Sequence, residues 1–132
     1  MSETSREILK TDKRGRGFWG PPEWTSLHTK AAVYKPEKAQ AFKNYIYALP
    51  DLLPCEECGK HLAANLKKYP IDNYLRNNHD LFFWTYILHD AVNQQHNTYK
   101  PNEPKKYSPP FEEVKRYYFK ALGEDCKICE IV

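Results

Sequence analysis

The chain has 132 residues, of which 41% are hydrophobic and 28% charged, and a formal net charge of +3 at pH 7. This length suits one domain with its own core, and no apolar run is long enough to span a membrane. The modest charge gives no indication of a nucleic-acid partner, and we predict none. No apolar segment follows the first methionine, so we expect no secretory signal peptide.

The N-terminal segment, residues 1–17, mixes charges without apolar periodicity and ends in Gly-Arg-Gly. This composition predicts a flexible arm. The next segment has apolar residues at helical spacing and should form a helix that starts near Pro21-Pro22 and ends before Pro36. A second helix is expected over residues 37–49.

The third helix should begin at the cysteines of "LLPCEECGKH" and run to about residue 68, and the fourth should cover residues 80–95. A proline-rich connector leads to a fifth helix, for which Ser108 is the expected cap and Gly123 the expected stop. No segment alternates with the period of a strand. The sequence therefore predicts an all-α bundle.

The four cysteines form two C-x-x-C pairs, Cys55 with Cys58 and Cys126 with Cys129. At a helix start, unpaired backbone N–H groups and the helix dipole stabilise a thiolate at the first position, here Cys55. One turn later, Cys58 is close enough for a disulfide and faces the bundle. The second pair lies beyond the last expected helix, in a tail. Because a tail can swing, this dithiol suits an electron carrier better than a buried structural disulfide.

Three kinds of protein remain open from the residues alone. One is a zinc-binding Cys₄ interaction module or a tighter site that includes His61, although the pairs are farther apart than in ordinary zinc ribbons, and we predict no metal ligand. Another is a flavin-free dithiol carrier or a disulfide-stapled adaptor. The third is a thiol oxidase, which needs an organic electron acceptor, most economically a flavin, and no G-x-G-x-x-G motif is present to bind it in a Rossmann fold.

Three segments together resemble the Erv/ALR-type FAD-linked sulfhydryl oxidases. "FWGPPEWTSLHTKAA" resembles the W-x-x-L-H-x-x-A helix of that family, "PCEEC" its redox centre, and "FFWTYILHDAVNQQ" its W-x-x-x-x-H-N-x-V-N helix. Their order and spacing agree over about residues 18–122. The W-G-P-P-x-W form and the short chain resemble the versions encoded by large DNA viruses.

The resemblance implies a four-helix bundle with a short fifth helix that holds FAD, usually as a homodimer. It implies that Cys58 lies against the flavin, that Cys55 exchanges with an incoming dithiol, and that Cys126 and Cys129 are the shuttle pair. Electrons from thiols of client proteins would pass to O₂ and give H₂O₂. The expected cofactor-binding residues are Trp24, His28, His89, Val92, Asn93 and Tyr117, whereas Trp84 is expected in the core.

The sequence departs from the family pattern at three positions. Asp90 stands where asparagine is usual and brings a negative charge toward an anionic cofactor, while His96 and Thr98 stand where leucine and lysine often follow. The expected domains are the arm 1–17, the oxidase domain 18–122 and a tail 123–132 with the second C-x-x-C. A viral protein of this kind would act in the host cytoplasm or the virion, and a cellular one in the mitochondrial intermembrane space.

Overall fold

The structure is a computed structural model, and it describes residues 15–125. Within this range the chain has five α-helices, two short 3₁₀-helices and no strand, which confirms the predicted all-α class. The α-helices are α2 (Arg16–Ala32), α3 (Ala39–Leu52), α4 (Glu56–Lys68), α5 (Asn78–Tyr99) and α6 (Phe111–Asp125). The 3₁₀-helices are η1 (Pro36–Lys38) and η2 (Ile71–Tyr74), and the sequence did not predict η2.

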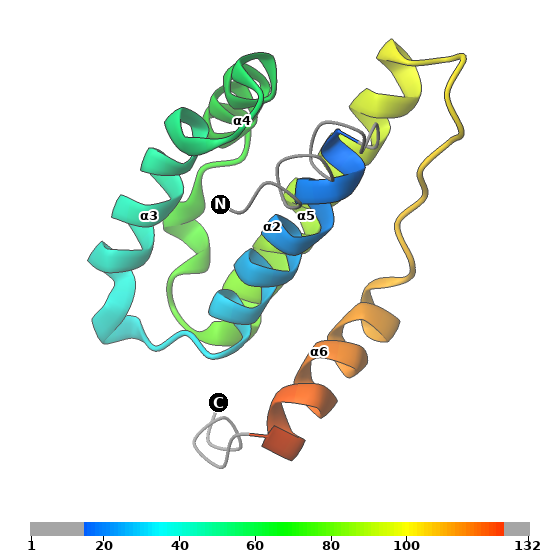
Figure 1. Cartoon of the computed structure of the whole chain (residues 1–132). Helices are drawn as coiled ribbons and strands as arrows, with labels where there is room; N and C mark the ends of the chain where they lie inside the picture. The colour runs from blue at the N-terminus through cyan, green and yellow to red at the C-terminus, as the bar shows by residue number, and fades with distance from the viewer. Residues whose placement is uncertain (1–14, 126–132) are drawn as a thin grey trace, which may run out of the picture.

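The helices are arranged as two packed pairs with α6 laid along one of them. Figure 1 shows α2 against α5 and α3 against α4, and α6 packs on α2 and α5. A connector without helical structure, residues 100–110, runs beside α5 before α6 begins. In the part of the chain described here, no helix combines the length and the apolar character needed to cross a bilayer.

The core is one cluster of buried apolar side chains to which α2, α3, α4 and α5 all contribute. Burying one large apolar side chain in this core stabilises the fold by roughly 1.5–3 kcal/mol relative to leaving it exposed. Trp84 is fully buried, as predicted, and its indole N–H donates to the Tyr69 carbonyl at 2.9 Å. The largest fully buried side chains are Trp84, Phe82, Ile46, Ile71, Leu81, Leu88, Asn65 and Thr85.

The first helix starts earlier than the sequence predicted. It begins at Arg16, not at Pro21-Pro22, so both prolines lie inside α2 and two residues of the predicted arm are helical. A proline fits a helix because its ring fixes φ near the helical value, and what it removes is one ladder hydrogen bond. Pro21 and Pro22 are the sixth and seventh residues of α2, beyond its first turn, so each removes a ladder hydrogen bond and crowds the carbonyl four residues earlier.

Two other expected helix ends, before Pro50 and at Gly123, are also wrong. Helix α3 continues through Pro50 to Leu52, and Gly123 lies inside α6, which runs to Asp125. Ser108 does not cap α6, because its hydroxyl is used by side chains of α5. Helix α5 ends at Tyr99, four residues beyond the expected end at residue 95.

Gly59 allows α4 to approach α3 closely. A Cβ at this position would lie 2.1 Å from the carbonyl oxygen of Pro50, which is backbone and cannot move aside. We expect Gly59→Ala to lower the free energy of unfolding by about 2–4 kcal/mol, because the two helices must separate. The matched control is Gly123→Ala, whose Cβ meets nothing within 4 Å.

Urea unfolding followed by circular dichroism measures both variants. Gly123→Ala is expected to be neutral or to stabilise the protein by up to about 1 kcal/mol, because alanine is the better helix former. If Gly59→Ala were as stable as Gly123→Ala, the close contact between α3 and α4 would be wrong.

Candidate redox and cofactor site

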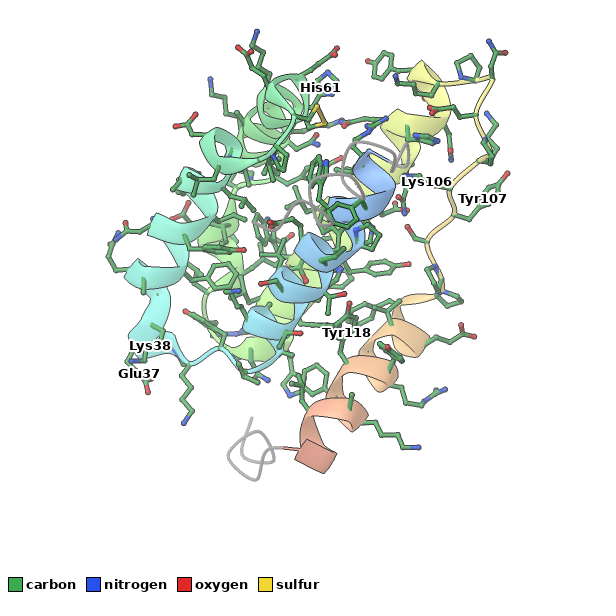
Figure 2. All side chains as sticks on the ribbon, viewed as in Figure 1. Glu37, Lys38, His61, Lys106, Tyr107 and Tyr118 are labelled. Carbon is green, nitrogen blue, oxygen red and sulfur yellow. A yellow bond between two sulfur atoms is a disulfide. The ribbon has the colours of Figure 1, made fainter. Side chains whose placement is uncertain are left out.

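Cys55 and Cys58 form a disulfide at the start of α4, with their Cα atoms 5.1 Å apart. Cys55 is the N-cap residue of α4, and its sulfur accepts a hydrogen bond from the backbone N–H of Cys58 at 3.1 Å. A reduced Cys55 would keep this donor and the positive end of the helix dipole, both of which favour its thiolate. Figure 2 shows the sulfur–sulfur bond beside His61.

The two sulfur-bearing residues differ in what they face. A cavity of about 620 Å³ opens between the two helix pairs, and Cys58 lines it whereas Cys55 does not. Volumes of roughly 300–1,000 Å³ are typical of small-molecule and cofactor sites. The cavity brings together five of the sequence-predicted residues, namely Trp24, Cys58, His89, Val92 and Asn93.

Trp24 and His89 form a flat aromatic wall of this cavity. Their rings stack with centroids 4.0 Å apart and planes within 5° of parallel. The tryptophan comes from α2 and the histidine from α5, so the contact depends on the packing of these helices. Flat aromatic faces of this kind suit a planar ligand.

A chain of hydrogen bonds fixes the protons on two histidines. The Thr85 hydroxyl donates to the Phe82 carbonyl at 2.6 Å, so it accepts the bond from Nδ1 of His28 at 2.8 Å. His28 therefore carries its proton on Nδ1, and its Nε2 accepts from Nδ1 of His89 at 3.1 Å. By this assignment, His89 keeps Nε2 as a free acceptor.

Both histidines are neutral at pH 7. Burial, and to a lesser extent the neighbouring His89, lowers the pKa of His28 to about 3. Burial also lowers the pKa of His89 to about 4, with the charge of Lys106 acting in the same direction and that of Asp90 against it. A neutral pair is what the hydrogen-bond chain requires, since a protonated Nε2 on His28 could not accept.

This pair predicts that the fold weakens as the pH falls. In the unfolded chain a histidine titrates near 6.5, so below that pH the unfolded state binds a proton that buried His28 does not. The stability that depends on His28 is therefore complete well above pH 6.5 and is lost as the pH falls from about 6.5 toward 3. Between pH 6.5 and 5 the loss from His28 alone is about 2 kcal/mol.

Urea unfolding at several pH values tests this dependence. His28→Gln is expected to be less stable at pH 7 but to lose less stability on acidification, whereas His61→Gln, at an exposed position, should keep the wild-type slope. Equal slopes for all three proteins would contradict the assignment to His28.

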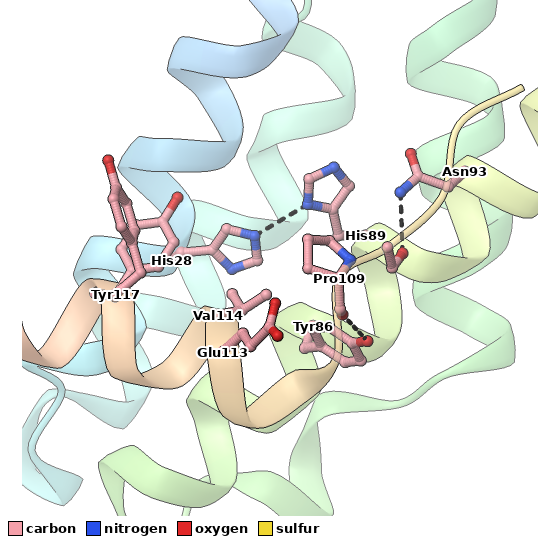
Figure 3. Close-up of a pocket in the computed structure, with 10 residues that line it drawn as sticks. His28, Tyr86, His89, Asn93, Pro109, Glu113, Val114 and Tyr117 are labelled. Atoms are coloured by element: carbon pink, nitrogen blue, oxygen red, sulfur yellow. Dashed lines mark hydrogen bonds between the residues drawn. The ribbon is translucent and has the colours of Figure 1, made fainter. Parts of the chain in front are cut away.

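A second cavity, of about 450 Å³, lies between α5 and α6 (Figure 3). His28 and Tyr117 line it together with His89 and Asn93, which line both cavities. Tyr117 is 71% exposed and does not reach the larger cavity. Its neighbour Tyr118 lines both, and the helical spacing of Val114, Tyr118 and Leu122 is the signal that this tyrosine faces inward.

The side chain of Asp90 points to the connector and lines neither cavity. Its two oxygens accept bonds from the Ser108 hydroxyl at 2.8 Å and from the Gln94 amide at 2.6 Å. Asn93 in turn donates to the Ser108 hydroxyl at 3.0 Å. The negative charge expected near an anionic cofactor is thus used to hold the connector against α5.

The second C-x-x-C, Cys126 and Cys129, lies outside the described residues. Within residues 15–125, no group of three or more His, Cys, Asp or Glu side chains is arranged to hold a metal ion. His96 is buried with Nε2 3.1 Å from the Pro104 carbonyl, and its Nδ1 makes no hydrogen bond, although a carboxylate oxygen of Glu103 lies 3.9 Å away. This buried nitrogen belongs to a residue that lines the larger cavity, where a bound group could satisfy it.

Comparison with known proteins assigns the family. The Erv1/Alr family model matches residues 22–116. A putative FAD-linked sulfhydryl oxidase of Invertebrate iridescent virus 3 is 31% identical over 104 residues, covering 72% of this chain and 69% of the viral protein. The FAD-linked sulfhydryl oxidase of African swine fever virus is 33% identical over 84 residues, covering 60% and 68%.

A more distant relative is a FAD-linked sulfhydryl oxidase of Saccharomyces cerevisiae, 27% identical over 90 residues, which cover 65% of this chain and 45% of the yeast protein. No solved structure matches this chain significantly. Because the family model spans most of the chain, including the C-x-x-C of α4 and the Trp24–His89 wall, this chain belongs to the Erv1/Alr family and resembles its members encoded by large DNA viruses.

Proposed function

We propose that this chain is an FAD-dependent sulfhydryl oxidase that forms disulfides in client proteins. The observation that carries the proposal is the position of the disulfide at the wall of the larger cavity, with Cys58 inside and Cys55 outside. A dithiol placed this way can take electrons from a protein on one side and deliver them to a cofactor on the other.

The larger cavity fits FAD in size and chemistry. It has the volume of a cofactor site, the Trp24–His89 wall for a planar ring, and the unsatisfied Nδ1 of His96 for a polar group of the ligand. Trp24, His89, Val92 and Asn93 would hold the cofactor there. His28 would hold the ring of His89 in position through their hydrogen bond, and Tyr117 would contribute to cofactor binding from the smaller cavity.

The chain's own part of the reaction is thiol–disulfide exchange. A client dithiol reduces the Cys126–Cys129 disulfide and becomes a disulfide itself. A thiolate of the shuttle pair then attacks the sulfur of Cys55, which breaks the Cys55–Cys58 bond, forms a mixed disulfide and releases Cys58 as a thiolate inside the cavity. The second thiol of the shuttle pair attacks the mixed disulfide, which re-forms Cys126–Cys129 and frees Cys55. When bound, FAD would supply the acceptor for the electron pair that Cys55 and Cys58 release as their disulfide re-forms, with O₂ as the final acceptor and H₂O₂ as the product.

Within one copy, the described end of α6 lies far from the disulfide. Phe119 stacks on His79 at the start of α5, so α6 ends beside that end of the helix, whereas Cys58 shares its cavity with His96 near the other end. Residues 79 and 96 of a helix are about 25 Å apart. From Asp125, Cys129 reaches at most about 14 Å. This geometry favours transfer between two copies, in a homodimer.

The viral relatives favour action in the host cytoplasm or the virion over the mitochondrial intermembrane space.

Oxygen uptake with dithiothreitol as the thiol tests the proposed oxidase activity, with H₂O₂ measured alongside. We expect one O₂ consumed for each dithiothreitol oxidised and no effect of a metal chelator. A zinc module would lose its fold in chelator and consume no oxygen, and a flavin-free dithiol carrier would become oxidised once without turnover.

A further inference from the structure

The larger cavity carries more positive than negative charge on its walls. Arg16, Lys100 and Lys106 line it, against one carboxylate, that of Glu23. None of the three cations has an ion-pair partner in the described range, where the ion pairs involve other basic residues. Unpaired cations around a cavity suit an anionic ligand.

Helix α5 itself provides no cation at the position where the family pattern often has a lysine. Thr98 occupies it, and its hydroxyl donates to the Gln94 carbonyl of the preceding turn at 3.0 Å. Thr98 does not line either cavity. The cation that binds a phosphate of the cofactor must therefore come from a part of the chain other than α5.

The connector supplies it, because α5 fixes the backbone of Lys106 in place. The side-chain oxygen of Asn97 accepts the N–H of Lys106 at 2.7 Å, and its amide donates to the Lys106 carbonyl at 2.7 Å. Lys105 turns the other way, and its ammonium donates to the Asn97 backbone carbonyl at 3.2 Å. The two adjacent lysines thus differ: Lys105 bonds to the backbone of α5, whereas Lys106 lines the larger cavity. Figure 2 shows Lys106 on the connector beside the end of α5.

The charge of Lys106 acts on the aromatic wall of the cavity. It is the second cause, after burial, of the lowered pKa of His89. His89 stacks on Trp24 in the wall of the same cavity, so the ammonium of Lys106 is close enough to influence what binds there.

We propose that Lys106, presented by the Asn97 clamp, binds the diphosphate of FAD in place of a lysine on α5. The proposal rests on the proposed function, since it names a group of the same cofactor. A lysine contacts phosphate oxygens as a compact charge with three donors, so its contribution is electrostatic and falls with salt. Arg16 and Lys100 line the same cavity and add to the positive field.

Flavin titrations test this role without turnover. Apo-protein is titrated with FAD and with riboflavin, which has no phosphate, and binding is followed by flavin fluorescence at low and high salt. For Lys106→Gln we expect FAD to bind about tenfold more weakly at low salt, with a smaller salt dependence, and riboflavin to bind as to the wild type. The matched control, Lys105→Gln, removes the same charge one residue away and should leave both affinities unchanged.

Two results would overturn the role of Lys106. One is an equal FAD affinity in Lys106→Gln and the wild type. The other is an equal loss of FAD and riboflavin binding, which would mean that the substitution acts through the fold. A wild-type protein that binds neither flavin would overturn the proposed function itself, whereas FAD binding insensitive to Lys106→Gln overturns the diphosphate contact alone.

Discussion

Replacing Cys58 by serine is expected to lower thiol oxidation to below about a thousandth of the wild-type rate while FAD stays bound. Cys58 is the member of the disulfide that lines the larger cavity, so without its sulfur the electron pair has no route from Cys55 to the cofactor. Serine nearly matches cysteine in size, and the aromatic wall of Trp24 and His89 is untouched. The measurements are oxygen uptake with dithiothreitol and the flavin content of the purified variant.

A matched control separates this effect from loss of any cysteine. Cys126→Ser keeps the disulfide of α4 intact, and dithiothreitol is small enough to reduce Cys55–Cys58 directly, so this variant should turn over dithiothreitol at about the wild-type rate. If Cys58→Ser retained a tenth or more of the activity, or if both variants lost activity equally, the division of roles between the two pairs would be wrong.

The second large effect concerns reduced protein clients. A chain with Cys58→Ser and a chain with Cys126→Ser and Cys129→Ser should each fail to oxidise a reduced protein. When the two chains are co-expressed, activity should return, because the shuttle of one copy can serve the disulfide of the other. Random pairing makes half of the dimers mixed, each with one working route of two, so about a quarter of the wild-type rate is expected.

The result depends on the distance along α5 between the end of α6 and Cys58. If electrons passed only from the shuttle pair to the disulfide of the same copy, the mixed preparation would stay as inactive as the separate variants, since neither chain holds both working pairs. Oxidation of dithiothreitol by the same mixture serves as the control, because it requires only the disulfide of α4 and should reach about half of the wild-type rate.

The sequence predicted the position of the first C-x-x-C pair because its signals are local. A C-x-x-C at a helix start places one sulfur at the N-cap and the other one turn inside, and α4 has this arrangement. The expectation that Trp84 lies in the core is likewise confirmed, since its side chain is fully buried. Periodicity and capping act within a few residues, so one sequence is enough to read them.

The parts that were missed depend on contacts between distant residues. The bond from His28 to Thr85 spans 57 positions, and nothing near Thr85 indicates that its hydroxyl sets the protonation of a histidine on another helix. Ser108 has the composition of a helix cap, yet Asp90 and Asn93 use its hydroxyl. Local propensity gave way to tertiary hydrogen bonding in each case.

The charges of the cavity show the same limit. Thr98 and Asp90 weaken the phosphate-binding pattern of α5, and the basic segment 105–115 is the compensation that the sequence offers, without showing which of its cations acts. Asp90 turns toward the connector, and the connector brings Lys106 to the cavity through the clamp of Asn97. Extended segments such as residues 100–110 have no periodicity from which the direction of a side chain can be read.

The most direct test of the account is the visible absorption spectrum of the protein as purified, with the chromophore released by denaturation and identified. The site around Cys58, Trp24 and His89 predicts a yellow protein that carries one FAD per chain. A colourless protein that remains colourless after incubation with FAD would contradict it.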